Sequence, residues 1–288
     1  MKVLLLSCST GEGHNHCALA VKEALDARGH ETSFLDMLHM FGDPGPLSFD
    51  KILNHISTNV PDVFGMMYHA GAMYSATGVT SPVYLANIRH ARQLREFILA
   101  RGYDAVVCSH LFPMETLTFL RRHEDLPVRC YGVLSDYTCI PFLAETELDG
   151  YFLPHEAVRA DCMAAGMPAE KLIVSGMPVA AKFTAPMTKQ AARELLGLPQ
   201  DKRIYLIMTG GIGCGDAVTL CEAIRRVPDE DALLCVLPGR NEELRTTLEE
   251  KYAGHGVLTV PFTSLLTAVM IKKYHKKKEQ TKDSGSGE

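Results

Sequence analysis

The sequence predicts an α/β protein in which parallel strands alternate with helices. Short apolar runs end in polar or glycine-containing turns, and the segments that follow carry apolar residues at helical spacing. This alternation occurs in both halves of the chain. Of the 288 residues, 47% are apolar and 22% are charged, so the chain can bury the cores of one large or two ordinary domains.

Composition excludes several classes of protein. A net charge of -5 argues against a dedicated nucleic-acid binder. The nine cysteines include no C-x-x-C pair, so neither zinc binding nor redox chemistry is indicated. The apolar run at the N-terminus is too short for a signal peptide, and no run is long enough to span a bilayer. We therefore expect a cytoplasmic protein that can still touch a membrane from that side.

The first domain, residues 1–177, opens with a βαβ unit. Residues 3–7 form a continuous apolar run, which is typical of a buried strand in a parallel sheet. Residues 17–28 have helical spacing, and residues 31–35 read as the second strand. Further strands are expected at 104–108, 128–134, 150–153 and 172–174, and helices at 89–100, 114–123 and 155–165.

The pattern stops at residues 178–186 and then restarts, which predicts a hinge between two similar α/β domains. The second domain is expected over residues 187–270. Its strands are predicted at 203–208, 232–236 and 257–260, and its helices at 189–196, 217–226 and 242–251. Residues 271–288 are rich in lysine and then of low complexity, so we expect a disordered tail.

Ligands of open parallel sheets bind beyond the carboxyl ends of the strands. At the first such end, Gly11-x-Gly13-His14 allows a tight turn and places His14 at the start of the next helix. The positive end of the helix dipole disfavours the imidazolium, and a neutral imidazole can accept a proton from a hydroxyl. A histidine that merely caps the helix is an equally good interpretation.

Two other strand ends carry polar candidates. His110 follows the strand at 104–108, where orienting a loop is favoured over a functional role. Asp136 follows an apolar strand, where a carboxylate needs a partner or a ligand. It can pair with His14, hold an acceptor molecule, or form a structural hydrogen bond in its loop.

The second domain has a glycine-rich first turn of its own, with Gly210, Gly211 and Gly213 between a strand and a helix. Such a loop suits a diphosphate group. It lacks both the nicotinamide fingerprint and the Gly-Lys-Ser/Thr of nucleotide hydrolases. The segment 60–85, which includes Met67 and Tyr68, suits an adaptable apolar ligand, although packing in the core is slightly favoured.

Six motifs occur in the order found in the monogalactosyldiacylglycerol synthase and processive diacylglycerol glucosyltransferase family, which this chain resembles over residues 1–265. They are Ser9-Thr10-Gly11-Glu12-Gly13-His14-Asn15, Ser109-His110-Leu111-Phe112-Pro113, Leu134-Ser135-Asp136-Tyr137, Val174-Ser175-Gly176-Met177-Pro178-Val179, Met208-Thr209-Gly210-Gly211-Ile212-Gly213 and Gly239-Arg240-Asn241. The resemblance implies a GT-B fold, with two Rossmann-like doubly wound domains. It also implies inverting transfer of a hexose from a UDP-sugar to a diacylglycerol-type lipid hydroxyl, with no cofactor and no obligatory metal.

The resemblance also implies roles for single residues. His14 matches the family's general base, and Asp136 matches the aspartate of the family's Thr-Asp-Phe/Tyr motif, with Ser135 here in place of Thr. The implied acceptor-side residues are Gly11, Gly13, His110, Tyr137, Met67 and Tyr68, and the implied donor-side residues are Gly210, Gly211, Gly213, Arg240 and Asn241. Peripheral association with the inner face of the membrane is implied as well.

The chain departs from the family pattern in two places. Residues 139–142, Cys-Ile-Pro-Phe, replace the usual His and Trp. The later Lys-Pro-Gly-Gly motif and Gln-Glu pair are absent, so we expect an incomplete second domain. Two alternatives remain open: a non-catalytic remnant that binds lipid or nucleotide, and an enzyme of the UDP-sugar epimerase type.

Overall fold

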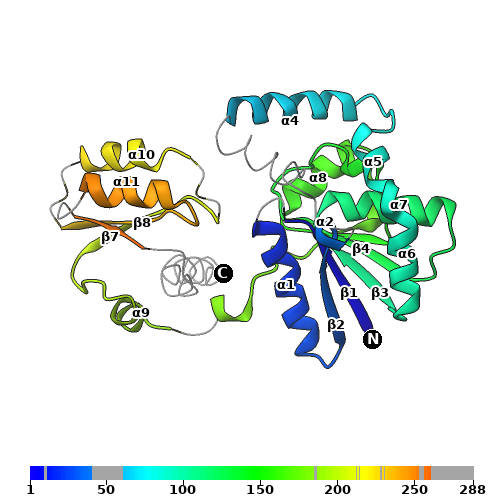
Figure 1. The fold of residues 1–288 in the computed structure, drawn as a ribbon, viewed down its shortest axis with the longest axis horizontal. Coiled ribbons are helices and arrows are strands. Elements are labelled where there is room, and N and C mark those ends of the chain that lie inside the picture. Colours follow the sequence, from blue (N-terminus) through cyan, green and yellow to red (C-terminus); the bar gives the residue numbers. More distant parts are fainter. Residues whose placement is uncertain are drawn as a thin grey trace, which may run out of the picture. The chain divides into compact units, whose positions relative to one another are not determined.

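The computed structural model describes residues 1–9, 12–40, 61–184, 187–211, 213, 215–227, 229, 231–252 and 256–260. The chain divides into two compact units, Met1–Ala180 and Ala181–Glu288, each with its own sheet (Figure 1). The division falls inside the predicted hinge, residues 178–186. The predicted tail, residues 271–288, lies outside the described residues.

Unit 1, Met1–Ala180, contains a sheet of six parallel strands in the order β2-β1-β3-β4-β5-β6. The chain passes from β1 to β2 and then returns across β1 to β3, so the winding reverses between β1 and β3. Ligands of such sheets bind at this reversal, beyond the carboxyl ends of the strands. The strands are β1 (Lys2–Ser7), β2 (Glu31–Asp36), β3 (Ala105–Cys108), β4 (Arg129–Val133), β5 (Gly150–Leu153) and β6 (Leu172–Val174).

The apolar run of β1 is buried on both faces of the sheet. Val3 and Leu5 pack in a cluster with Ala18 of α1 (Glu12–Asp26). Leu4 and Leu6 point the other way, into a larger cluster with residues of α6 (Ala91–Ala100) and α7 (Leu111–His123). Successive side chains of a strand alternate between faces, so the continuous apolar run allows helices to cover both sides, as in a doubly wound fold.

Two helices begin earlier than the sequence pattern predicts. Helix α1 begins at Glu12 instead of Cys17, and α7 begins at Leu111 instead of Met114. His110 caps α7, because its Nδ1 accepts a hydrogen bond from the Phe112 amide at 3.2 Å. The pattern missed this start because serine, threonine, aspartate and asparagine are the usual caps.

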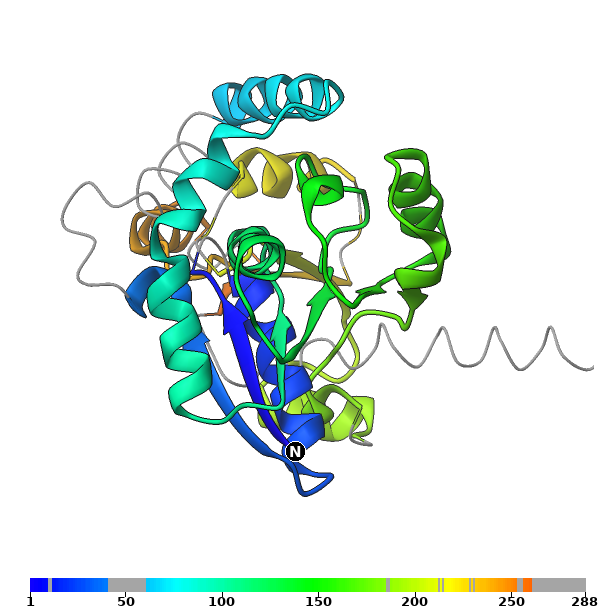
Figure 2. The ribbon, with the colours of Figure 1, turned by 90° about the vertical axis from the view of Figure 1, so that its right-hand side faces the viewer.

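The remaining helices of unit 1 include one that stands apart. Helix α4 (Pro61–Ser75) lies at the periphery of unit 1, away from the sheet, in both Figure 1 and Figure 2. In the part of the chain that the structure describes, no helix has the length and apolar character needed to cross a membrane. The other helices of unit 1 are α2 (Met37–Met40), α5 (Pro82–Asn87), α8 (Glu156–Ala164) and the 3-10 turns Ile88–His90, Leu143–Glu145 and Ala169–Lys171. A further 3-10 turn, Ala181–Phe183, belongs to unit 2.

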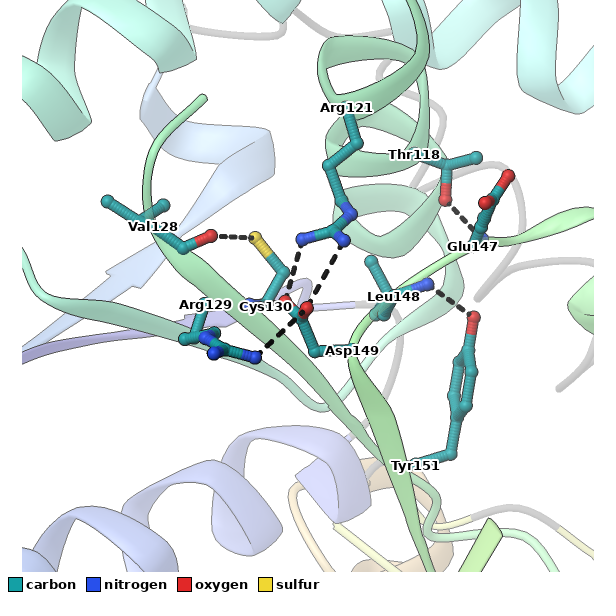
Figure 3. Close-up of polar contacts among 9 residues, drawn as sticks. All are labelled: Thr118, Arg121, Val128, Arg129, Cys130, Glu147, Leu148, Asp149 and Tyr151. Carbon is teal, nitrogen blue, oxygen red and sulfur yellow. Dashed lines mark hydrogen bonds and ion pairs between the residues drawn. The ribbon is translucent and has the colours of Figure 1, made fainter. Parts of the chain in front are cut away.

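A charged cluster fixes the far end of α7 to the amino ends of β4 and β5 (Figure 3). Arg121 makes two hydrogen bonds to Asp149, of 2.7 and 3.2 Å, and the Cys130 amide donates to the same carboxylate at 2.7 Å. Arg129 adds a longer ion pair at 3.7 Å. Because α7 is held at this end, His110 at its other end has a defined place at the carboxyl edge of the sheet.

Unit 2 has three parallel strands in sequence order, β7 (Arg203–Met208), β8 (Ala232–Leu237) and β9 (Val257–Thr259). Helices α10 (Ala217–Arg225) and α11 (Glu242–Tyr252) cover one face, where Cys221 and Leu248 pack on Val236. Helix α9 (Lys189–Leu195) comes before the sheet. The predicted strands of both units agree with the observed ones to within one residue at each end.

Candidate functional site

The carboxyl ends of β1, β3 and β4 border a pocket of about 460 Å³ in unit 1. The polar residues that line the pocket are His14, Ser109, His110, Ser135 and Asp136. The rest is lined mainly by apolar side chains of α4, α7 and the segment after β4. A pocket of this volume, apolar with a few converging polar groups, is the usual form of a small-molecule site.

His14 lies in the first turn of α1, where β1 delivers it to the pocket. Its Nδ1 is 2.9 Å from the carbonyl oxygen of Ser109 and 3.0 Å from the Oγ of Ser135. Three neighbouring strands thus supply this contact, since Ser109 follows β3 and Ser135 follows β4. The predicted position of His14 at a helix start beside a binding pocket agrees with this geometry.

His110 is the second histidine of the pocket and is only 8% exposed. Its ring meets the ring of His14 edge to face, with 4.7 Å between the centroids. Burial, and then the proximity of His14, holds the pKa of His110 well below its ordinary value. His110 is therefore uncharged at neutral pH, and it caps the start of α7.

Asp136 lines the pocket but does not pair with His14: within the described residues, no ion pair joins the two side chains. The Asp136 carboxylate influences two other groups. Burial and then this carboxylate raise the pKa of the Cys17 thiol to about 12. The same two causes raise the pKa of Tyr68. Asp136 is thus an acidic side chain on the pocket wall.

The other predicted acceptor-side residues are placed differently. Met67 and Tyr68 line the pocket from α4. Tyr137 does not line it and is 67% exposed. Gly13 lies in α1 with room for a Cβ atom, so the fold itself does not require glycine there. Gly11 lies outside the described residues.

Helix α4 is not the core helix that the sequence slightly favoured. Met66 is 71% exposed and Met73 is 76% exposed, and these residues, seven apart, share one stripe of the helix. Another stripe, with Met67, Tyr68 and Gly71, faces the pocket.

The segment after β4 holds α4 in place. The Phe142 amide donates to Ser75 Oγ at 3.0 Å, and the Phe142 ring lies against Gly71 and Tyr74. Phe142 has a φ of 68°, a region that costs a non-glycine residue roughly 1 kcal/mol or more. Ile140 also lines the pocket, although it belongs to the segment 139–142 that departs from the family pattern.

Two polar residues of the pocket were noted in the sequence only as strand-end neighbours of His110 and Asp136. Ser109 and Ser135 both contact His14, although neither was assigned a role of its own. Ser109 directly follows the predicted strand at 104–108, and Ser135 directly follows the one at 128–134. Their position at a strand end was the available signal, since the carboxyl ends of adjacent parallel strands lie at one edge.

In unit 2, the loops after β7 and β8 lie against each other. The Arg240 amide donates to the Gly211 carbonyl at 3.0 Å, and Asn241 Nδ2 donates to the Gly213 carbonyl at 3.2 Å. Gly213 has a φ of 81°, and a Cβ there would collide with Pro238 and Asn241. Four of the five predicted donor-side residues, Gly211, Gly213, Arg240 and Asn241, are thus joined by hydrogen bonds between the two loops. Among the described residues, no cluster of His, Cys, Asp or Glu side chains suits a metal ion.

A six-stranded parallel sheet that reverses between β1 and β3, followed by a smaller parallel sheet, defines a protein of the GT-B class. Solved structures of this class share the fold. A glycosyltransferase from Rickettsia africae has a TM-score of 0.56 and 12% identity, covering 94% of this chain and 70% of its own. The UDP-GlcNAc 2-epimerase from Neisseria meningitidis bound to UDP-GlcNAc has a TM-score of 0.51 and 12% identity, covering 94% and 75%.

The family is given by sequence. The model of the monogalactosyldiacylglycerol (MGDG) synthase family matches residues 14–179, and this chain belongs to that family. Relatives named processive diacylglycerol beta-glucosyltransferase occur in Bacillus cytotoxicus, 25% identical over 252 residues, and in Bacillus mycoides, 25% identical over 253. The matches cover 86% of this chain and 62% and 63% of those relatives. The family resemblance read from the motifs is confirmed.

Proposed function

We propose that this chain acts in the inverting transfer of a hexose from a UDP-sugar to the hydroxyl of a diacylglycerol-type lipid. One observation carries the proposal: the pocket combines the imidazole of His14 with a mainly apolar lining. A hydroxyl that belongs to a lipid matches both parts of such a pocket. The names of the relatives, which describe diacylglycerol as an acceptor, support the same substrate class.

The proposed chemistry is a single displacement at the anomeric carbon. The acceptor oxygen forms a bond to that carbon while the bond to the diphosphate breaks, and the electron pair leaves with the diphosphate. The hydroxyl proton passes to His14. A general base of this kind typically contributes a factor of about 10² to 10⁴ in rate.

Other residues of unit 1 assist in this proposal. Asp136, on the pocket wall, accepts a hydrogen bond from the acceptor lipid and orients it toward His14. Met67 and Tyr68 contact its apolar part. We assign no contact to Tyr137, which lies outside the pocket.

The donor is proposed to bind unit 2. Its glycine-containing loop pair, which precedes α10 and α11, has the form that suits a diphosphate at the start of a helix. Arg240 adds a positive charge to this loop pair. The chain spans 62% of the length of the Bacillus cytotoxicus relative.

We also propose that α4 touches the cytoplasmic face of a membrane. Its outer stripe presents Val63, Met66 and Met73 to solvent, each at least 42% exposed. Apolar side chains gathered on one exposed helix suit the boundary between lipid headgroups and acyl chains. The inner stripe of the same helix lines the pocket, so a lipid could pass from the membrane to His14 along α4.

The proposal is tested by incubating the purified chain with radiolabelled UDP-glucose or UDP-galactose and diacylglycerol vesicles. We expect labelled glycolipid from the unaltered chain, and a loss of about 10²-fold or more with His14→Ala. His16→Ala is the matched control, because His16 is exposed on the same helix two residues further on. Equal rates for His14→Ala and the unaltered chain would overturn the role of His14.

A chain that transfers no sugar is the result expected of the non-catalytic alternative. In that case, calorimetry with UDP separates a chain that still binds nucleotide from one that does not. The epimerase alternative predicts conversion of the UDP-sugar in the absence of lipid. The apolar pocket wall favours a lipid acceptor over the soluble substrate of an epimerase.

A further inference from the structure

The hydrogen bonds of His14 specify which ring nitrogen carries the proton. Nδ1 lies 2.9 Å from the Ser109 carbonyl oxygen. A carbonyl oxygen only accepts hydrogen bonds, so Nδ1 must be the donor and must hold the proton in the neutral ring. The lone pair of the neutral ring is then on Nε2.

The Ser109 carbonyl is itself held firmly. Ser109 is 3% exposed, its amide donates to the Leu6 carbonyl at 3.0 Å, and its Oγ donates to Ser7 Oγ at 3.0 Å. These contacts join β3 to β1 at the reversal of the sheet. The first acceptor for the His14 proton is thus part of the fold.

Ser135 provides the second oxygen near Nδ1. Its Oγ lies 3.0 Å from that nitrogen and can accept a share of the same proton. The neighbouring residue Leu134 is fixed, because its amide donates to the Phe152 carbonyl of β5 at 2.9 Å. No carboxylate takes this place, since Asp136 forms no ion pair with His14 among the described residues.

The other ring in contact with His14 does not compete for its proton. His110 Nδ1 accepts the hydrogen bond from the Phe112 amide, so a neutral His110 carries its proton on Nε2. The two rings meet edge to face. The Ser135 hydroxyl, by contrast, lies within hydrogen-bond distance of His14 Nδ1.

We propose that Ser135 is a positioning residue that, together with the Ser109 carbonyl, holds His14 in the Nδ1–H tautomer with Nε2 turned to the pocket. The consequence for catalysis rests on the proposed function, in which the acceptor proton moves to Nε2. The tautomer itself does not depend on that function. A neutral hydroxyl here takes the place that a carboxylate occupies in many histidine-containing catalytic groups.

The test compares the full chain with Ser135→Ala, Ser135→Thr and Ser175→Ala. Ser175 is the matched control, because it follows β6 at the same edge of the sheet and its Oγ donates instead to the Gly176 carbonyl. Each protein is labelled with ¹⁵N-histidine for NMR, and the His14 signals are assigned by their loss in His14→Gln. The second readout is kcat and KM for sugar transfer.

We expect a protected Nδ1–H signal for His14 in the unaltered chain, because the proton lies between two oxygens. Ser135→Ala should broaden or abolish that signal by opening Nδ1 to water, while Ser135→Thr and Ser175→Ala keep it. For transfer, Ser135→Ala should lower kcat roughly fivefold with KM unchanged, which corresponds to one neutral hydrogen bond. Ser135→Thr should restore kcat.

Two results would overturn the inference: a proton on Nε2 of His14 in the unaltered chain, or an Nδ1–H signal and a kcat that Ser135→Ala leaves unchanged. The proposed function fails separately. If the Nδ1–H signal behaves as expected and the unaltered chain transfers no sugar, Ser135 still positions His14 and the transferase proposal is wrong.

Discussion

The two histidines at the carboxyl edge of the sheet, His14 and His110, differ in their hydrogen bonds. His110 is buried and uncharged at neutral pH and caps α7 through Nδ1, whereas His14 Nδ1 contacts the Ser109 carbonyl oxygen and the Ser135 hydroxyl. Two histidines in ring contact thus have different tasks because their hydrogen bonds differ. Their residue type alone could not separate those tasks in the sequence.

Another residue of α7, Glu115, is a fully buried carboxyl group. Asn87 donates to its Oε2 at 2.5 Å, while its Oε1 has no donor in the described part of the chain. Glu145 lies close by and is occupied by the amide and hydroxyl of Ser81. Burial is the main cause that raises the pKa of Glu115 to about 8, so a proton on Glu115 can bridge toward Glu145.

This pKa predicts how stability depends on pH. The folded chain keeps the Glu115 proton up to about pH 8, whereas the ordinary value is 4.5. The stabilisation of the folded chain by protonated Glu115 is therefore complete below about pH 4.5 and is lost as the pH rises to about 8. We expect the free energy of unfolding of Glu115→Gln to fall less than that of the unaltered chain over this range, by about 2 to 4 kcal/mol.

Urea unfolding at about pH 5 and about pH 8 measures this difference. Glu147→Gln is the control, because Glu147 is half exposed in its ion pair with Arg122. In this control, the free energy of unfolding should change with pH as it does in the unaltered chain. A Glu115→Gln variant with the same loss of stability at high pH would contradict the protonated state of Glu115.

At the scale of elements, α4 combines two surfaces on one helix. The stripe with Met67 and Gly71 closes the pocket, and the stripe with Met66 and Met73 is exposed. The strained backbone of Phe142 and its hydrogen bond to Ser75 tie the helix to the segment after β4. This arrangement places the proposed membrane contact and the acceptor pocket on opposite sides of one element.

The membrane contact is testable with paired substitutions. Met66→Gln with Met73→Gln should weaken binding to diacylglycerol-containing vesicles roughly tenfold, because two exposed apolar side chains no longer enter the lipid boundary. Co-sedimentation with the vesicles measures the effect. Met163→Gln is the control, since Met163 of α8 is 44% exposed and lies on another helix. Equal weakening by the control would argue against a specific role of α4.

In unit 2, the packing of two loops depends on glycine. Gly213→Ala should lower the free energy of unfolding by about 2 to 4 kcal/mol and reduce binding of UDP, because the added Cβ meets the backbone of Pro238 and the side chain of Asn241. Gly215→Ala is the matched control, with a φ of 91° but open space around it. It should cost only about 1 kcal/mol. Denaturation and calorimetry measure both, and equal losses would contradict the packing argument.

The elements were predictable from the sequence to different degrees. Strands were predicted closely, because buried parallel strands read as short continuous apolar runs such as residues 203–208. The helix start at Leu111 was not, because a histidine cap has no common signature. The exposure of α4 was not predictable either: a helix that is apolar on most sides gives no periodicity to separate a buried stripe from an exposed one.

The site was predictable in part for a related reason. His14 and Asp136 were found because strand ends of a parallel sheet are where ligands bind. The pairing of His14 with Ser109 and Ser135 was missed, because it depends on the spatial order β1-β3-β4, which the sequence does not state. The apolar wall at Ile140 and Phe142 was missed because only its difference from the family pattern was noticed.

At the scale of the whole molecule, the chain consists of two units with separate sheets and separate predicted tasks. Unit 1 contains the pocket proposed for the acceptor, which His14 and residues of α4 help to line. Unit 2 contains the glycine loop pair proposed for the diphosphate. The chain spans 62% of the length of the Bacillus cytotoxicus relative. We propose sugar transfer for the two units that this chain contains.

The most direct test of the account is the transfer of labelled hexose from its UDP-sugar to diacylglycerol by the unaltered chain and by His14→Ala. The account predicts labelled glycolipid from the unaltered chain and at least about a hundredfold less from His14→Ala, with His16→Ala close to the unaltered rate. Transfer that His14→Ala leaves intact, or no transfer by the unaltered chain, would contradict it.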